Sequence, residues 1–543
     1  MVRQFADPYA FLRELVQNSV DAGATRIDVT VELAGGQTAY TRVADDGSGM
    51  TRSVLENNLC TLFASTKEGD ASKVGKYGVG FVSVLAVEPD QVVVETWRAE
   101  ASLVLTLQRD HSWELQTGIE QTGSGTRVTL VHSMDRDAFG RHADQVVASL
   151  RRWCRHVRVP VQVATLDQGN PSANANQRIN APFSVFSPLV VSHQDELGEY
   201  VVGCAAGSDY LDPDEHTSPA ELDDRFAGFY NRGLTLYETD EERFAGLDGV
   251  RFKVASAAFA HTLSRDNVRR DAQFDRALAR VRKLVRNELR RELIEQLAAA
   301  AQDVDASPKR YLALLAAAQK PPLGLRPTEM TLALTDPIDG RRAVPLEQLA
   351  WATPWTEPVV VAEQSSPLTK VLSARGRPVL WDGGGRVVEL VADALRAHRL
   401  LSGVTHTRAD SLFTLVAPAA QAEPGDAELC DAVRQALAVA GTPCARVIVV
   451  RTSGRPQVPA SFVLEGSGPW ILEVGGRAAR PSRRATVALD AAHPPVQRAR
   501  QVPADRVPLA AQLLARLVLV ELGSPPSADE NEALLRALAG EPS

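Results

Sequence analysis

The order of three polar and glycine-rich elements near the start of the chain limits what it can fold into. The first is a predicted helix that carries Glu14, Asn18 and Asp21. The second is an acidic turn from Asp45 to Met50, and the third is a glycine-rich loop from Gly75 to Phe81. Each element alone has several explanations, but the three together, in this order and at this spacing, are far more informative.

The helix is predicted over Asp7 to Asp21, because apolar side chains recur on one side of it at helical spacing. Glu14, Asn18 and Asp21 stand at i, i+4 and i+7, so a helix places them on one face, opposite the apolar one. On that face, the carboxylate of Glu14 can polarise an attacking water, and the amide oxygen of Asn18 can bind Mg²⁺. A solvated polar helix face is the alternative explanation of this element.

The acidic turn, Asp45-Asp46-Gly47-Ser48-Gly49-Met50, directly follows a strand-like run that ends at Ala44. A carboxylate at the end of a strand, such as Asp45, can accept a hydrogen bond from an exocyclic amine such as adenine N6. Glycine residues let the backbone approach a flat ring, which fits Gly47 and Gly49. Taken alone, the segment could equally be a β-turn or half of a calcium loop.

The glycine-rich loop reads Gly75-Lys76-Tyr77-Gly78-Val79-Gly80-Phe81 and precedes a run with helical spacing. Glycines before a helix N-terminus expose backbone amides that can bind phosphate. The loop is not a dinucleotide-binding fingerprint, because the polar segment before it, Ser65 to Lys73, is not a strand. A glycine-rich run alone is a weak signal.

The length and composition predict a multi-domain protein without a disulfide framework. The chain has 543 residues, and about 100–200 residues per domain gives roughly three or four domains. The net charge of −8 does not favour nucleic acid as the main partner, and the five scattered cysteines form no zinc-binding pattern. No apolar run reaches the ~18 residues that a membrane span needs, so we expect a cytoplasmic protein that does not bind membranes.

The predicted elements give an α+β fold in which several regions follow one another. Residues 1–165 mix helices and strands, and the polar stretch at 167–176 is predicted to be a structureless linker. Strand-like runs and then a long charged helix, Asp271 to Ala301, form the next region. The predicted domains are residues 1–165, 182–320, 325–405 and 425–543.

Together with Gly125-Thr126, which enters a strand, the three elements resemble the four-box pattern of the GHKL ATPase superfamily. Within that superfamily, Asn57-Asn58-Leu59, Ser65-Thr66-Lys67 and Leu263-Ser264-Arg265-Asp266 are similar to segments of the 90-kDa heat-shock protein chaperones of bacterial type. The resemblance implies a Bergerat-type ATP-binding α/β sandwich, an α/β middle domain in two parts and a small α/β C-terminal domain.

The resemblance also implies a role for each matching residue. Glu14 would be the general base, and Arg265, from the middle domain, would act on the γ-phosphate. Asn18 would bind Mg²⁺, and Asp45 would bind adenine N6. The other residues expected at the ATP site are Asp21, Gly49, Met50, Asn58, Lys67, Gly75, Gly78, Val79, Gly80, Phe81 and Thr126.

We therefore expect a Mg²⁺-dependent ATPase that couples ATP hydrolysis to closure of a clamp on unfolded or client proteins. The helix Leu509–Leu522 is apolar on most of its circumference, which predicts a homodimer through the C-terminal domain; a core helix of a monomer is the alternative.

The competing function is a DNA-associated ATPase of the MutL or topoisomerase type. That function would require a lysine from a loop of the second domain, and Lys253 is the only lysine between positions 77 and 282. The sequence also contains no basic stripe with interleaved aromatic residues, so nucleic acid is not an expected partner.

Overall fold

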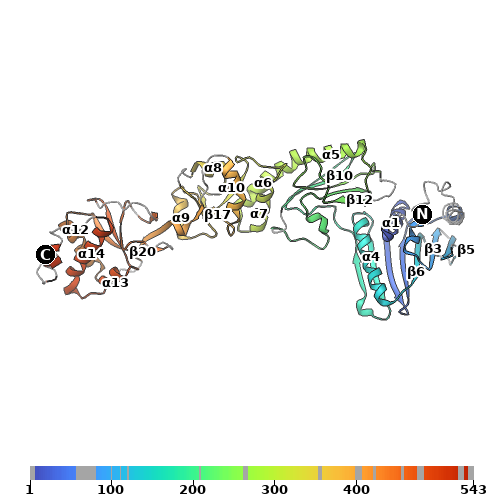
Figure 1. The fold of residues 1–543 in the computed structure, drawn as a ribbon, viewed down its shortest axis with the longest axis horizontal. Helices are drawn as coiled ribbons and strands as arrows, with labels where there is room; N and C mark the ends of the chain where they lie inside the picture. Colours follow the sequence, from blue (N-terminus) through green and yellow to red (C-terminus); the bar gives the residue numbers. More distant parts are fainter. Residues whose placement is uncertain are drawn as a thin grey trace. The chain divides into compact units, whose positions relative to one another are not determined.

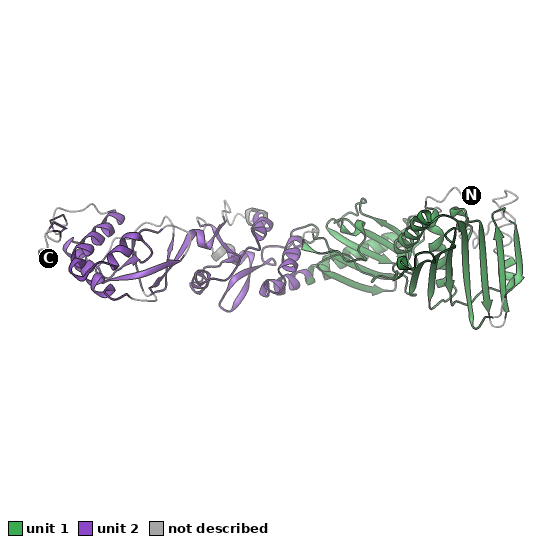
Figure 2. Ribbon diagram, turned by 90° about the horizontal axis from the view of Figure 1, so that it is seen from below, with its two compact units in different colours: residues 1–292, 320–324 green, residues 293–319, 325–543 purple. Residues whose placement is uncertain are grey.

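The computed structural model divides the chain into two compact units, which Figure 2 colours separately. The first unit is Met1–Glu292 with Lys320–Gly324, and the second is Leu293–Gln319 with Leu325–Ser543. The structure describes residues 7–56, 81–98, 101–110, 112–118, 121–206, 210–260, 267–352, 357–397, 406–419, 423–453, 458–466, 468–473, 482–523, 531, 532, 534, 535 and 538.

The first unit begins with an eight-stranded sheet in the order β5-β4-β3-β6-β2-β1-β7-β8. Side chains of β1 alternate between buried and half-buried, as its sequence predicts for a strand with one covered face. β1 pairs in parallel with β7, and all other neighbours in the sheet are antiparallel. The strands are β1 (Ile27–Ala34), β2 (Thr38–Asp45), β3 (Gln91–Arg98), β4 (Ala101–Gln108), β5 (Trp113–Thr117), β6 (Ser124–Ser133), β7 (Val161–Asp167) and β8 (Ala175–Arg178).

Two helices, α1 (Phe11–Asp21) and α4 (Arg136–Cys154), pack against each other and against β1 and β2 (Figure 1). A 3-10 turn at Pro8–Ala10 leads into α1, and Asp135 caps α4 by accepting a hydrogen bond from the Ala138 amide. Short helices follow the acidic turn and the glycine-rich loop: α2 (Arg52–Val54) and the 3-10 helix η5 (Phe81–Val87). The helix predicted after the glycine-rich loop is therefore a tighter 3-10 helix over its described part.

The predicted linker at 167–176 is wrong, because this stretch belongs to a hairpin at the edge of the sheet. β8 pairs with β7 in antiparallel register, and a short 3-10 turn at Pro171–Ala173 lies between them. The side chain of Asp167 accepts hydrogen bonds from the amides of Gly169 and Asn170, which holds the turn. Asn, Gly and Pro indicate a loop by composition, but here the backbone pairing with β7 outweighs that preference.

A second sheet in the first unit has the order β12-β11-β13-β10-β9. The predicted long helix over Asp271 to Ala301 is confirmed as one nearly continuous helical stretch, interrupted by a π-helical turn. The elements are β9 (Val190–Asp195), β10 (Gly198–Cys204), η8 (Pro219–Leu222), β11 (Ala227–Asn231), β12 (Leu234–Thr239), β13 (Val250–Ala255), α5 (Ala272–Leu284) and η9 (Val285–Leu289). The last helix of the stretch, α6 (Arg290–Gln302), begins in the first unit and continues into the second.

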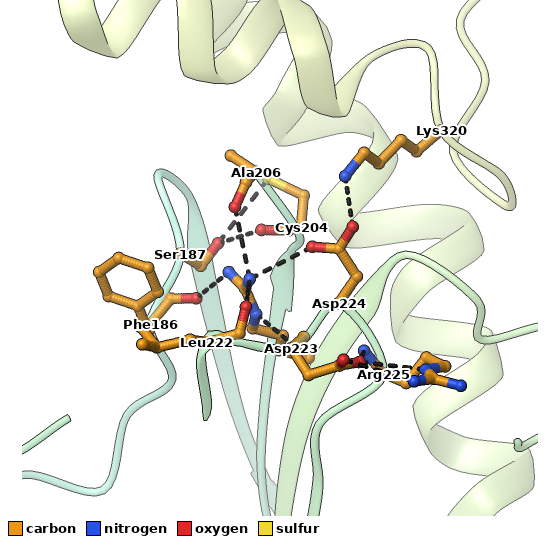
Figure 3. A network of polar contacts seen from close by, with 10 residues as sticks. Phe186, Ser187, Cys204, Ala206, Leu222, Asp223, Asp224, Arg225 and Lys320 are labelled. Atoms are coloured by element: carbon orange, nitrogen blue, oxygen red, sulfur yellow. Dashed lines mark hydrogen bonds and ion pairs between the residues drawn. The ribbon is translucent and has the colours of Figure 1, made fainter. Parts of the chain in front are cut away.

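A fully buried arginine, Arg251 on β13, ties together the loops around this second sheet (Figure 3). Its guanidinium donates to the backbone carbonyls of Phe186, Ala206, Leu222 and Asp223, at 2.6 to 3.3 Å. One side chain thus donates hydrogen bonds to four backbone carbonyls from the loops around the sheet.

The segment Lys320–Gly324 returns to the first unit after the chain has left it. Lys320 forms an ion pair with Asp224, and Asp224 in turn accepts a hydrogen bond from Arg251 at 3.2 Å (Figure 3). A side chain at Gly249 would collide with the Pro321 carbonyl, at 2.6 Å from its Cβ, so the segment lies directly on the loop before β13. The segment therefore acts as a strap on the second sheet.

The second unit contains two five-stranded sheets, ordered β15-β14-β17-β16-β18 and β21-β23-β20-β19-β22. The helix predicted over 509–522 is confirmed. The strands are β14 (Thr331–Ile338), β15 (Arg341–Pro345), β16 (Val359–Ala362), β17 (Leu380–Trp381), β18 (His406–Arg408), β19 (Phe413–Pro418), β20 (Arg446–Ser453), β21 (Ser461–Leu464), β22 (Trp470–Glu473) and β23 (Thr486–Asp490). The helices are α7 (Pro308–Ala317), α8 (Leu346–Ala352), α9 (Pro367–Ala374), α10 (Arg386–Ala397), α11 (Ala409–Leu412), α12 (Asp426–Val439), α13 (Pro494–Arg500), η10 (Ala504–Arg506) and α14 (Val507–Glu521).

Two features bear on the class of protein. Among the described residues, no helix is both long and apolar enough to span a membrane. Within the same residues, Cys154, Cys204, Cys430 and Cys444 are free thiols, and burial raises the pKa of the Cys154 thiol to about 12. Such a thiol is inert, as a structural core cysteine is expected to be.

A buried histidine on α4, His142, lies between the 3-10 turn before α1 and strand β2. Its Nδ1 is 3.0 Å from the Tyr9 hydroxyl, and its Nε2 is 2.7 Å from the Thr41 hydroxyl. Burial, with a smaller contribution from His132, lowers the pKa of His142 from 6.5 to about 4. The folded protein therefore holds this imidazole neutral at pH values where the unfolded chain would protonate it.

We predict that His142 makes the protein less stable in mild acid. Because the pKa is lower in the folded state, the unfolded state binds more protons, and stability present above about pH 6.5 is lost as the pH falls toward about 4. The free energy of unfolding should drop by up to about 3 kcal/mol through this group. Urea unfolding at the two ends of this range should show a smaller drop for His142→Gln than for wild type. An equal drop in His142→Gln would contradict the assignment.

Candidate functional site

The acidic turn is built around the carboxylate of Asp45, which lies at the end of β2. The Ser19 hydroxyl of α1 donates to its Oδ2 at 2.8 Å, and the Gly47 amide donates to its Oδ1 at 2.9 Å. Burial raises the pKa of Asp45, and the two hydrogen bonds, which favour the ionised form, oppose that rise. A carboxylate can accept several hydrogen bonds, so the group can also receive a donor from a ligand.

Two threonines from neighbouring strands lie at the same end of the sheet. Asp45 on β2 stands opposite Thr126 on β6, and Thr126 stands opposite Thr96 on β3. The hydroxyl of Thr96 lies 3.2 Å from that of Thr126 and accepts a hydrogen bond from the Met50 amide at 2.8 Å. Three adjacent strand ends thus hold the acidic turn in place.

The glycines of this region are required by close contacts. Gly49 has a φ of +65°, and a Cβ there would lie 2.3 Å from the Trp97 carbonyl oxygen. A Cβ at Gly125 would lie 2.4 Å from the Asp45 carbonyl oxygen, and one at Gly47 would lie 2.8 Å from the Cβ of Ala22. These positions admit no side chain, so the turn presents bare backbone beside Asp45.

Helix α1 contributes a second group of predicted residues. Glu14 is buried in its first turn, whereas Asn18 and Asp21 are exposed further along. The expected common polar face therefore runs from the protein interior at Glu14 to the surface at Asp21. The Asp21 carboxylate lies 2.6 Å from Nη1 of Arg232, a residue of the second sheet.

The remaining predicted residues divide into one that is described and seven that are not. Phe81 is buried in the core that η5 forms with α1. The predicted residues that lie outside the described part of the chain are Asn58, Lys67, Gly75, Gly78, Val79, Gly80 and Arg265. The two ends of the segment that includes Arg265 are joined, because the Arg269 amide donates to the Ala260 carbonyl at 2.7 Å.

Sequence reasoning missed two residues that hold the predicted ones in place. Ser19 lies among the apolar positions of α1, Thr96 lies on the buried face of β3, and both are buried. A polar residue on an otherwise buried face was the only signal available, and buried hydroxyls of that kind require a partner. Asp45 and the Met50 amide are those partners.

A cluster of buried charges lies where α4 meets the second sheet. Arg155, which follows α4, donates to Glu238 at 2.6 Å and pairs with Glu221 at 2.8 Å. Lys253 donates to the same Glu221 at 2.9 Å and lies 3.1 Å from Nε2 of His156. Burial, with the charges of Lys253 and Arg155, holds the pKa of His156 well below its ordinary value, so His156 is neutral and accepts from Lys253.

The position of Lys253 bears on the competing function. A lysine that acts on a bound nucleotide must be free to reach it from a loop, but Lys253 lies within strand β13 and is buried. Both of its partners, Glu221 and His156, belong to the structural cluster. This lysine is therefore part of the fold and not a free cation.

Comparison with known proteins agrees with this geometry. Residues 9–140 match the family described as histidine kinase-, DNA gyrase B- and HSP90-like ATPase. The chain is 29% identical to the chaperone protein HtpG of Methylococcus capsulatus over 34% of each chain. It is 28% identical to HtpG of Rhodospirillum rubrum over 30% of each chain, and 25% identical to HtpG of Chlorobaculum tepidum over 38% of this chain and 36% of that one.

The matched region thus spans about a third of the length of these curated relatives. The sequence-based recognition is confirmed by the family match and by the relatives together. The chain is a relative of the bacterial HtpG chaperones, and over residues 9–140 it carries an ATPase domain of the histidine kinase-, DNA gyrase B- and HSP90-like type.

Proposed function

We propose that the chain is an ATP-dependent molecular chaperone of the 90-kDa heat-shock protein type, which couples ATP hydrolysis to clamp closure on client proteins. The observation that carries the proposal is the Asp45 site: a half-buried carboxylate, held by Ser19 and Gly47, beside a turn where Gly49 has no room for a side chain. A flat base that carries an exocyclic amine fits such a site.

In this proposal, Asp45 accepts a hydrogen bond from adenine N6, and Thr126 and Gly49 support that contact. The amides of the loop from Gly75 to Phe81, with Asn58 and Lys67, hold the phosphates. Met50 completes the expected set at the pocket, whereas Asp21, the other residue expected there, pairs with Arg232. These residues bind and orient ATP so that its terminal phosphate faces Glu14.

For hydrolysis, Glu14 accepts a proton from a water molecule while the water oxygen attacks the γ-phosphorus. The bond from the γ-phosphorus to the bridging oxygen breaks, so that ADP and inorganic phosphate are the products. Asn18 would hold Mg²⁺ through its amide oxygen, and the ion would neutralise charge on the phosphates. An Mg²⁺ ion bound mainly by phosphate and water requires few protein ligands, which is compatible with a single exposed amide on α1. Arg265 would add positive charge at the γ-phosphate.

The alternative of a DNA-associated ATPase has less support. It requires a free lysine from the second domain, and Lys253 is buried between Glu221 and His156. The net charge of −8 also disfavours binding to a polyanion. A DNA-binding measurement is therefore included in the test of function below.

Helix α14 supports the proposed C-terminal homodimer. One face packs into the core with α12, while Leu513 and Val520 are about half exposed, at 51% and 55%. They stand seven residues apart, which is two turns of a helix, so both lie on one side of α14. A second copy of this helix is the partner that we propose for that side.

The first prediction from this proposal concerns adenine recognition. Asp45→Asn removes a charged acceptor, which should cost about 1.5–3 kcal/mol of binding, or roughly 10- to 150-fold in ATP affinity. Calorimetry would measure this, with Asp90→Asn, at the other end of the sheet, as the control that keeps wild-type affinity. Equal affinity in Asp45→Asn and wild type would remove Asp45 from the site.

The second prediction concerns hydrolysis and chaperone activity together. Glu14→Ala should lower kcat by ~10²–10⁴ and leave ATP affinity within a few-fold, because a general base acts on the transition state. In a light-scattering assay with a heat-unfolded model protein, wild type should suppress aggregation more strongly with ATP than without it. Glu14→Ala should lose that ATP-dependent gain, and Glu32→Ala, an ion-paired residue of β1, should keep it.

Binding to duplex DNA, measured on the same wild-type preparation, separates the two functions. Tight DNA binding without suppression of aggregation would favour the alternative. Full turnover in Glu14→Ala would contradict the assignment of the base.

The third prediction concerns assembly. Wild type should have the mass of a dimer by light scattering, and Leu513→Asp with Val520→Asp should shift it to a monomer, because charges would be buried at the interface. Leu197→Asp, at an exposed apolar residue of the first unit, should leave the mass unchanged. If the wild-type protein is a monomer at micromolar concentration, α14 is a core helix of a monomeric domain and the proposed dimer is wrong.

A further inference from the structure

The turn between β11 and β12 has an unusual conformation that its position explains. Arg232 and Gly233 form its two central residues, with φ of +51° and +84°. Such two-residue turns match the twist of a hairpin, but an arginine in the left-handed region is uncommon. A Cβ at Gly233 would lie 2.2 Å from the His156 carbonyl oxygen, so the turn sits directly on the backbone after α4.

The left-handed conformation of Arg232 accompanies an ion pair with helix α1. Nη1 of Arg232 lies 2.6 Å from Oδ1 of Asp21, the last residue of that helix. The two side chains are 63% and 46% exposed. Exposed pairs of this kind contribute only about 0–1 kcal/mol to stability, so the contact is of more use for orientation than for folding.

Backbone hydrogen bonds link the end of helix α1 to the acidic turn. The Ala22 amide, just beyond Asp21, donates to the Asn18 carbonyl, and the Ser48 amide donates to the Ala22 carbonyl at 3.0 Å. The carboxylate of Asp46 caps the next amides, at Thr25 and Arg26. A shift of this helix end would therefore move both the turn beside Asp45 and the helix that carries Glu14.

The opposite side of the hairpin is held by groups that do not depend on Asp21. The Asn231 side chain donates to the Phe259 carbonyl at 2.9 Å, which fixes the start of the turn to the loop after β13. The Thr235 hydroxyl of β12 donates to the Arg152 carbonyl of α4 at 2.8 Å. Glu238 of β12 accepts from the buried Arg155. The hairpin thus provides a rigid base from which Arg232 reaches α1.

We propose that Arg232 is a positioning residue for ATP hydrolysis: its ion pair with Asp21 sets the end of α1, and thereby Glu14, relative to the second sheet. The inference rests on the proposed ATPase function. It assigns the Asp21 carboxylate to the second sheet and not to the nucleotide. ATP binding at Asp45 does not require the pair, because Ser19 and Gly47 hold Asp45 from within the first sheet and α1.

The test compares Arg232→Ala, Arg232→Glu, Asp21→Arg and the charge-swapped double variant, Arg232→Glu with Asp21→Arg, in the full-length chain. Small misplacements of a catalytic group can cost up to roughly a hundredfold in rate, so each single variant should lower kcat by about tenfold or more. ADP affinity, measured by calorimetry, should stay within about threefold of wild type, because ADP binding does not use Glu14. The double variant should recover most of the lost kcat.

Two further measurements separate positioning from a general loss of structure. Hydrogen exchange of the amides around Ala22 should be faster in the single variants and slower again in the double variant. Arg109→Ala is the matched control, since Arg109 also forms an exposed ion pair, with Asp90 at 3.2 Å, but lies away from α1. It should leave kcat and this exchange at wild-type values.

Several results would overturn the proposal. These are a kcat in Arg232→Ala equal to that of Arg109→Ala, equal losses of kcat and ADP affinity, or a double variant as slow as the single ones. A wild-type protein that binds ATP without turnover, or a Glu14→Ala variant with full turnover, would instead overturn the proposed function. The exchange data then decide on the ion pair alone, because they do not depend on hydrolysis.

Discussion

The buried ion pairs of Arg155 are the interaction on which the arrangement of the first unit depends. Arg155 stands at the residue where α4 ends, and Glu221 and Glu238 of the second sheet region enclose its guanidinium. Removal of one member of such a cluster leaves a buried charge without compensation, which costs about 3–5 kcal/mol. Separation of helix α4 from the strands of the second sheet would therefore carry a large free-energy cost.

Two further contacts in this region are of a different kind. Gly233 touches the chain after α4 through backbone, and Arg232 reaches Asp21 through an exposed ion pair. The buried Arg155 pairs are thus strong and hold α4, and the exposed Arg232–Asp21 pair is weak and contacts α1. Both helices cover the same face of the first sheet. The second sheet thus contacts α4 through buried charges and α1 through an exposed ion pair.

Sequence reasoning predicted most of the elements and part of the site. Period and spacing predicted α1, β1 and the long helix after Asp271, because each has a one-sided apolar pattern that packing requires. The glycines at 47, 49 and 125 carried a recoverable signal, since close backbone contact excludes every other residue there. Ser19 and Thr96 carried no comparable signal, because single hydroxyls on buried faces reveal their partners only after folding.

The two largest differences have physical causes. The hairpin at 167–176 has the composition of a loop, and only its pairing with β7, which is not visible in composition, makes it a strand edge. The polar face of α1 was predicted as uniform, but Glu14 is buried and Asp21 is exposed. Asp21 pairs with Arg232, which lies more than two hundred positions away in the sequence. The seven predicted site residues outside the described chain stay predictions.

The strap from Lys320 to Gly324 has a consequence for how the protein can be divided. The polypeptide passes from the first unit to the second within α6 and forms α7 there. It returns to the first unit at Lys320–Gly324 and belongs to the second unit from Leu325 onward. No single cut in the chain can excise either unit intact. A gene fragment that stops at Glu292 would lack Lys320, and Asp224 would then face the guanidinium of Arg251 without its second cation. Independent expression of the first unit would therefore need the strap supplied as a graft or a permuted terminus, so evolution by simple exchange of contiguous modules is restricted at this junction.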